Sequence, residues 1–149
     1  RAANALKTSV LALLVLLAAP AWGLEYRTTA RAAILYDAPS ATSNRLAVVG
    51  GKVPLEVIAD SGDWVKVRDA NGHLSWIEKS ALGTSRSVMV KVEESIVRQQ
   101  PEPDAVPVFR AARGVLLDAL GEPTALGWLQ VRHVDGLSGW LRTYEVWGR

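Results

Sequence analysis

The sequence contains no cysteine, so it can form neither a disulfide nor a lipid-modified cysteine at a mature N-terminus. It has only two histidines, His73 and His133, and neither stands in the HxxH, HxxE or HxH spacing that is typical of metal sites. The glycine pair at 50–51 lacks the spacing of a Walker loop. Because the residue types that usually carry catalysis do not gather anywhere, we expect no enzyme, no cofactor and no bound metal.

Clusters of basic residues are also absent. The chain has 17 Lys+Arg and 15 Asp+Glu, and residues 1–23 hold two of the bases and no acid, which leaves 15 of each sign in the remainder. Nucleic-acid binding requires clustered Lys and Arg to displace phosphate counterions, whereas here the two signs alternate along the chain. We therefore expect no nucleic-acid partner.

The chain has one long apolar run, Val10 to Ala19, behind a short basic stretch. Small residues follow it, so residues 1–23 have the pattern of a secretory signal peptide cleaved after Ala21 or Gly23. The alternative is an uncleaved anchor, but a spanning helix needs about 20 apolar residues and this run ends at Pro20. We expect a periplasmic or secreted protein with no stable membrane span after cleavage.

A motif present twice organises the rest of the chain. Trp64-Val-Lys-Val-Arg68, Asn-Gly and Trp76-Ile are followed sixty-four positions later by Trp128-Leu-Gln-Val-Arg132, Asp-Gly and Trp140-Leu. Each copy alternates apolar and polar residues around a pair that favours a hairpin turn. Each copy is therefore expected to form a β-hairpin with a tryptophan on each arm.

The upstream segments repeat as well, with an offset of sixty-two that relates Ala33–Pro39 to Ser95–Pro101. Two copies of a unit of about sixty residues is the economical interpretation. It predicts one domain over residues 24–83 and a second over residues 84–149, each composed of short strands separated by glycine and proline. Strands are expected at 26–30, 33–36, 46–49, 53–58 and the hairpin 64–77, with a helical turn at 79–82, and in the second copy at 88–92, 96–98, 108–111, 115–120 and the hairpin 128–141.

These residues carry a resemblance to a known family. Ile96-Val-Arg-Gln-Gln-Pro101, Gly127-Trp-Leu-Gln-Val-Arg132, Asp135-Gly and Gly139-Trp-Leu141 are similar, in order and spacing, to the bacterial SH3 module. The first copy departs from the family at Tyr36, where Arg is usual, and at Ser75, where Gly is usual. The resemblance implies an all-β protein of two tandem five-stranded SH3-like barrels. It also implies a non-catalytic module connected with the cell wall or with envelope proteins.

Four residues form the candidate ligand groove: Tyr36, Trp64, Arg98 and Trp128. Trp64 and Trp128 alternate with core valines, so they should face away from the core, where the resemblance places the groove. An aromatic face there can stack on a sugar or a proline, and an arginine can bind a carboxylate through its planar fork. The alternative is structural: the rings pack on a neighbouring loop or barrel, and Tyr36 and Arg98 tie their own loops.

The remaining aromatic and basic residues are assigned structural roles. Trp76 and Trp140 adjoin the aliphatic residues of the closing strands and are expected to fill the small cores. Trp147, beside Tyr144, is expected to plug the C-terminal end. Finally, Arg68 and Arg132, beside Asp69 and Asp135, are predicted to form solvated ion pairs.

The sequence therefore predicts a binding protein for a cell-envelope component, with peptidoglycan or its peptide stem as the favoured ligand. An interaction module for an envelope protein is the alternative. A small envelope amidase or peptidase is the third possibility, for which no catalytic set can be assembled from the residues.

Overall fold

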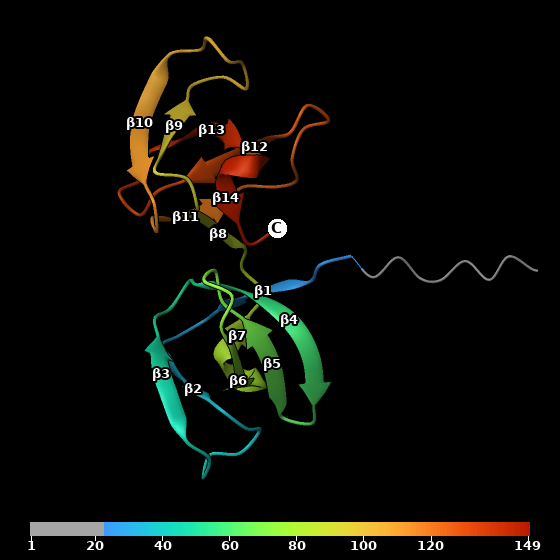
Figure 1. Ribbon diagram of the computed structural model, residues 1–149. Helices are drawn as coiled ribbons and strands as arrows, with labels where there is room; N and C mark the ends of the chain where they lie inside the picture. Colours follow the sequence, from blue (N-terminus) through green and yellow to red (C-terminus); the bar gives the residue numbers. More distant parts are fainter. Residues whose placement is uncertain (1–22) are drawn as a thin grey trace, which may run out of the picture.

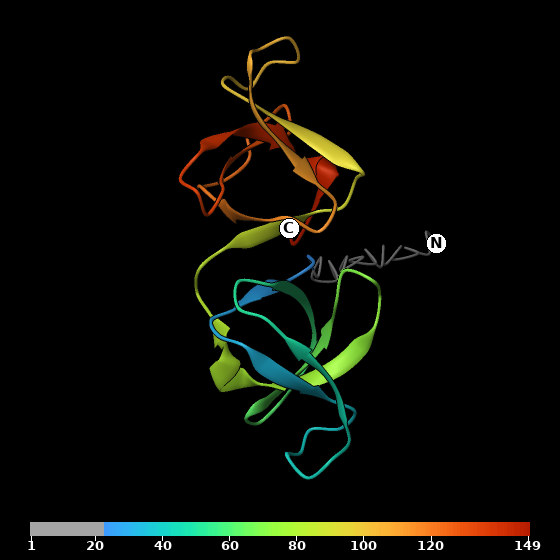
Figure 2. The same cartoon turned by 90° about the vertical axis from the view of Figure 1, so that its left-hand side faces the viewer.

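The computed structural model describes residues 23–149, which form two β-barrels, one from each half of this part of the chain (Figures 1 and 2). The prediction of an all-β protein with two small tandem barrels is confirmed. The signal peptide expected over residues 1–23 lies, apart from its last residue, outside the described residues. None of the helices within residues 23–149 is long and apolar enough to cross a membrane.

The first barrel is an antiparallel sheet with the strand order β3-β2-β6-β5-β4-β1-β7. Its strands are separated by turns and by one 3-10 helix, η1, which realises the predicted helical turn. The bounds are β1 Tyr26–Thr29, β2 Ala33–Tyr36, β3 Arg45–Val49, β4 Pro54–Ser61, β5 Trp64–Arg68, β6 Leu74–Glu78, η1 Lys79–Ala81 and β7 Leu82–Gly83.

The second barrel repeats this topology with the order β10-β9-β13-β12-β11-β8-β14. Each barrel thus has seven strand segments, because a two-residue strand after the 3-10 helix returns to pair with the first strand. The bounds are β8 Ser87–Val90, β9 Glu94–Arg98, β10 Pro107–Ala112, β11 Leu116–Ala119, β12 Trp128–Arg132, β13 Ser138–Arg142, η2 Thr143–Glu145 and β14 Val146–Trp147.

The two predicted hairpins form as β5–β6 and β12–β13. In the first, the Gly72 N–H donates to the Asp69 carbonyl at 3.0 Å, and Gly72 has φ +88°. Asn71 keeps a negative φ, so the loop is built around an ordinary turn followed by a left-handed glycine rather than a two-residue turn. Gly136, with φ +95°, repeats this in the second hairpin.

The core of each barrel is aliphatic. The first comprises Leu35, Leu55, Val65, Val67, Ile77, Ala81 and Leu82, and the second Val88, Val90, Val97, Ala111, Leu117, Leu129, Val131, Leu141 and Val146. The prediction that Trp76 and Trp140 fill these cores is wrong. Ile77 and Leu141 are fully buried, and because adjacent residues of a strand face opposite sides, the neighbouring tryptophans lie on the outer face, half-buried.

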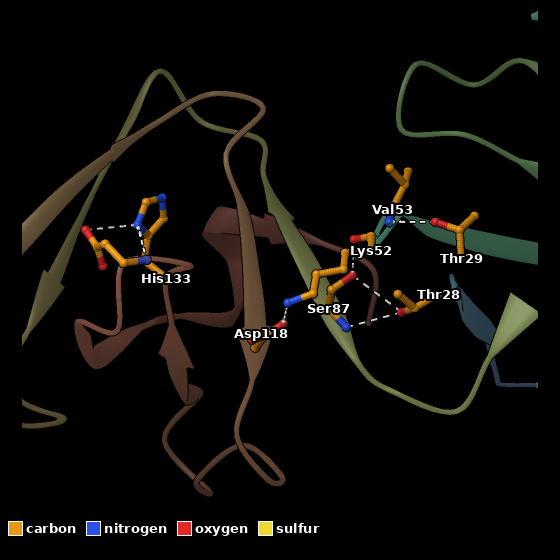
Figure 3. A network of polar contacts seen from close by, with 8 residues as sticks. Thr28, Thr29, Lys52, Val53, Ser87, Asp118 and His133 are labelled. Atoms are coloured by element: carbon orange, nitrogen blue, oxygen red, sulfur yellow. Dashed lines mark hydrogen bonds and ion pairs between the residues drawn. The ribbon is translucent and has the colours of Figure 1, made fainter. Parts of the chain in front are cut away.

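The two barrels touch through a defined interface (Figure 3). The Ser87 hydroxyl donates to the Lys52 carbonyl at 2.6 Å, and the Ser87 N–H donates to the Thr28 hydroxyl at 3.2 Å. Trp147, expected to plug the C-terminal end, packs edge-to-face on Tyr26 of the first barrel, with ring centroids 5.1 Å apart. The C-terminal strand thus joins the two halves.

Candidate functional site

In each barrel the two predicted groove residues lie close together, the tryptophan on the hairpin and its partner on the neighbouring strand β2 or β9. In the first, Lys66 pairs with Trp76 and Trp64 with Glu78, while Tyr36 of β2 pairs with Trp76 from the other side. Val65 is buried, so alternation carries Trp64 to the outer face as the sequence predicts. The same register holds in the second barrel, where Trp128 pairs with Arg142.

In the first barrel, Tyr36 and Trp64 pack edge-to-face with centroids 5.3 Å apart. Tyr36 is only 6% exposed and Trp64 is half-buried, so little of the tyrosine surface is accessible to a ligand. The ring pair has two separate hollows beside it, one of about 200 Å³ lined by Tyr36 and one of about 500 Å³ lined by Trp64. Glu78 lines both.

In the second barrel a single groove of about 360 Å³ contains both predicted residues, Arg98 and Trp128. Its surface combines apolar side chains with four charged ones. The lining residues are Val92, Glu94, Ile96, Arg98, Pro103, Trp128, Arg142, Tyr144 and Glu145.

Trp128 lies on the outer face but is 4% exposed, so it is not an open aromatic plate. The Arg142 guanidinium covers it, with its central carbon 4.1 Å from the ring centroid, and one guanidinium N–H donates to the Leu126 carbonyl at 3.0 Å. Such cation–π contacts contribute about 0.5 to 2 kcal/mol. The Trp128 ring therefore packs under the Arg142 guanidinium, and Arg142 lines the groove.

Sequence reasoning missed Arg142. The offset of sixty-four that defines the repeat places Glu78 at the equivalent position, so the two grooves carry opposite charge at one corner. The signal was available: β12 and β13 pair in a hairpin, which puts the residue opposite Trp128 on the same face.

Arg98 ties its own loop. Its guanidinium donates to the Ala105 carbonyl at 2.8 Å, which holds the segment after β9 against the barrel. The structural alternative raised for this residue is thus realised, while the side chain still lines the groove. Nearby, Glu94 pairs with Arg110, and the Glu145 carboxylate accepts the Arg142 backbone N–H at 3.2 Å.

Neither hairpin arginine pairs with the aspartate predicted for it. Arg68 pairs across strands with Glu56 at 3.0 Å, not with Asp69, whose carboxylate accepts the Asn71 and His73 N–H groups. Asp135 accepts the Leu137 N–H and contacts His133 at 3.0 Å. The Leu137 hydrogen bond, and then the His133 contact, hold the pKa of Asp135 below its ordinary value. These acids stabilise turns.

The described part of the chain holds no cluster of candidate metal ligands. No group of three or more acidic, histidine or cysteine side chains within residues 23–149 could hold a metal ion. His73 and His133 each contact one aspartate of their own hairpin and lie in different barrels.

Comparison with known families adds an independent finding. The profile of the family described as "Bacterial SH3 domain" matches twice, at residues 30–83 and 91–148. The two matches coincide with the two barrels and together cover well over half of the chain. No curated protein matches the chain significantly.

Solved structures with a related arrangement have low similarity. NlpC2 from Trichomonas vaginalis has a TM-score of 0.39 at 11% identity, covering 85% of this chain and 49% of its own. NlpC1 from the same organism has 0.39 at 12%, with 88% and 48% covered. An NlpC/P60 family protein from Bacillus cereus ATCC 10987 has 0.38 at 16%, with 83% and 56% covered. The chain spans about half the length of each.

Proposed function

Because the chain belongs to the bacterial SH3 domain family, we propose that it is a non-catalytic binding protein for a cell-envelope component, with peptidoglycan or its peptide stem as the favoured ligand. The observation that carries the proposal is the groove of the second barrel. It unites Arg98, Arg142 and Tyr144 around an apolar base.

The chemistry of this groove suits an extended ligand that carries both charged and apolar groups. Arg142 and Arg98 each spend one N–H on a backbone carbonyl, which fixes the guanidinium and leaves further donors of the planar fork for a carboxylate. Glu94 and Glu145 lie on the same lining and can accept hydrogen bonds from an amine. Tyr144 is 68% exposed and offers an aromatic face for a sugar ring or a peptide.

The groove of the first barrel is less suited to the same ligand. Tyr36 stands at the position equivalent to Arg98, and its ring packs on Trp64. Glu78 stands at the position equivalent to Arg142. We expect the second barrel to supply most of the affinity, and the first to bind weakly or to bind a different group.

A non-catalytic role is part of the proposal. An envelope amidase or peptidase would need a nucleophile and base, or a metal with an activated water, converging on one point. The sequence has no cysteine, and its two histidines serve hairpin turns in separate barrels. Export through the signal peptide expected over residues 1–23, to the periplasm or the exterior, would bring the chain to its ligand.

Co-sedimentation with purified peptidoglycan tests the proposal. We expect the wild-type protein to sediment with the sacculi, and Tyr144→Ala and Arg142→Gln to lose at least about tenfold in affinity, since each removes an exposed or charged contact of about 1.4 kcal/mol or more. Both variants keep the buried Trp128.

Leu137→Ala is the matched control, because Leu137 is an exposed apolar residue of the same barrel, at the hairpin tip outside the groove. Its sedimentation should equal that of the wild type. If the wild type stays in solution at high peptidoglycan concentration, the alternative of an envelope protein partner applies, and a pull-down from the envelope fraction follows. Release of soluble fragments from the sacculi would contradict the non-catalytic assignment.

A further inference from the structure

A cleft of about 400 Å³ lies where the two barrels meet, away from the groove described above. Its volume falls within the range of small-molecule sites, about 300 to 1,000 Å³. The first barrel contributes a glycine turn and the second contributes β11 and the end of β12. The lining residues are Gly51, Lys52, Ser87, Gly114, Val115, Leu116, Leu117, Asp118, Arg132, His133 and Val134.

The duplicated sequence shows what is unusual here. In the first barrel Arg68 pairs with Glu56 across β5 and β4 at 3.0 Å. The equivalent residues of the second barrel, Arg132 and Asp118, are directly opposite each other on β12 and β11, yet they form no ion pair. Among residues 23–149, Arg132 has neither a salt bridge nor a side-chain hydrogen bond. The cleft therefore contains a guanidinium whose expected partner is engaged elsewhere.

That partner is engaged by Lys52 of the first barrel, whose amine lies 3.5 Å from the Asp118 carboxylate (Figure 3). Lys52 has φ +60°, the left-handed conformation that side chains rarely adopt, and it is the one such non-glycine residue between positions 23 and 149. Its backbone is held on both sides, because its N–H donates to the Thr29 carbonyl at 2.8 Å and its carbonyl accepts the Ser87 hydroxyl at 2.6 Å. The interface thus holds the Lys52 backbone at the cleft, and the Lys52 amine adds a second cation there.

The other side of the cleft is apolar. Leu116 is half-buried and Val134 is 85% exposed, whereas Leu117 points into the core of the second barrel. The half-buried Leu116 and the exposed Val134 therefore lie beside two cations and one carboxylate, which leaves an excess of one positive charge next to an apolar surface. This combination suits a ligand with an anionic head and an apolar body.

We propose that the cleft between the barrels is a binding site for a small organic carboxylate with an apolar body. Arg132 binds the carboxylate through its unused fork, Lys52 adds a second charge from the other barrel, and the apolar body lies on Leu116 and Val134. A bound ligand would contact both barrels and stabilise their relative orientation. This site is distinct from the envelope-binding groove and stands independently of it.

Titration with butanoate, hexanoate and octanoate, followed by amide NMR shifts and calorimetry, tests the proposal. We expect saturable binding of one molecule per chain, with affinity rising along the series as further methylenes are buried. Shifts should appear in both Lys52 and Leu116. Hexanamide, which has the same body without the charge, should bind at least about tenfold more weakly.

Arg132→Gln should weaken hexanoate binding by about tenfold or more, whereas Arg45→Gln, the same change at an exposed arginine of β3 outside the cleft, should leave it unchanged. Val134→Asp, which places a negative charge on the apolar side, should abolish binding. Equal binding of hexanamide, unchanged affinity of Arg132→Gln, or no saturable binding of any of the three carboxylates at millimolar concentration would each overturn the proposal. Tyr144→Ala tests the groove of the second barrel, and its effect on peptidoglycan binding has no bearing on carboxylate binding in the cleft between the barrels.

Discussion

Trp64 and Trp128 occupy the same place in the two copies, but their surroundings differ. Both lie on the outer face of the hairpin, and Trp64 is half-buried beside Tyr36 whereas Trp128 is 4% exposed beneath Arg142. A side chain on the outer face of a strand can still be buried when a long neighbour folds over it. Position on the strand therefore fixes the direction of each ring, and the neighbour fixes its exposure.

This difference has a measurable consequence. Trp128→Ala should lower the free energy of unfolding by about 3 to 5 kcal/mol, the usual cost of removing a buried tryptophan. Trp140→Ala should cost less, because its ring is only half-buried and lies outside the aliphatic core. Denaturant unfolding of the two variants makes the comparison. A larger loss for Trp140→Ala would mean that Trp140 holds the barrel together.

Ser95 presents a second residue-scale prediction. Its hydroxyl is buried and has no hydrogen-bond partner within the described residues, whereas its equivalent in the first barrel is Ala33. Because an unpaired buried hydroxyl costs about 1 to 3 kcal/mol, Ser95→Ala should raise the free energy of unfolding by about 1 kcal/mol.

Ser87→Ala is the control for that experiment, since the Ser87 hydroxyl donates to Lys52 and this variant should lose stability instead. Urea unfolding measured for both is sufficient. A destabilised Ser95→Ala would show that the hydroxyl is paired in solution.

At the scale of elements, the approach of β13 to β9 depends on one glycine. A Cβ on Gly139 would lie 2.6 Å from the Arg98 carbonyl oxygen and 2.8 Å from Val97 Cγ1, both closer than van der Waals contact permits. The first barrel has Ser75 at this position. The first barrel therefore accommodates a side chain at this position, where Ser75 is buried.

Gly139→Ala should destabilise the protein by about 1 to 3 kcal/mol, the typical cost of overpacking, and should displace Arg98 from the groove. Gly50→Ala is the matched control, because a Cβ there meets no atom within 4 Å and Gly50 has no left-handed backbone. Thermal unfolding together with the Arg98 side-chain NMR signal distinguishes the two effects. An unchanged midpoint for Gly139→Ala would mean that the strands separate without cost.

At the scale of the whole molecule, the C-terminal strand and the first strand hold the barrels together. Trp147 packs on Tyr26, and a Cβ on the adjacent Gly148 would lie 2.7 Å from the Pro54 side chain. Burial raises the pKa of Tyr26 above its ordinary value, and the Glu56 carboxylate raises it further while Arg68 lowers it. The Tyr26 hydroxyl at the interface therefore loses its proton at a higher pH than a tyrosine in the unfolded chain does.

The pH dependence follows from this shift. Because the folded protein holds the Tyr26 proton more tightly than the unfolded chain does, the associated stability is complete below the unfolded pKa of about 10 and is lost as the pH rises through the raised folded pKa. Tyr26→Phe keeps the ring on Trp147 but cannot ionise, so its stability should fall less steeply above about pH 10. Unfolding measured across this range tests the expectation, with Tyr144→Phe, at an exposed site, as the control. Identical slopes for wild type and Tyr26→Phe would contradict it.

Much of the architecture was predictable from the sequence, because alternation and turn residues act locally. The longer strand segments, the two hairpins, the 3-10 turn after Glu78 and the duplication all follow from the order of residues over short distances. The two-residue strands β7 and β14 were not predicted. The outer-face position of Trp64 and Trp128 follows from the same alternation. The error over Trp76 and Trp140 arose when residue size was given more weight than this period.

The tertiary structure alone decided how residues distant in sequence meet. The sequence by itself determined two barrels of one kind, with Trp64 and Trp128 on the strand faces opposite the core. Only the folded chain placed Arg142 over Trp128 and turned Asp118 toward Lys52. It also left Arg132 without an ion-pair partner among residues 23–149, in a cleft between the barrels. Alternation fixes the face of a side chain, but partners and exposure depend on packing between strands and between barrels, which no local pattern encodes.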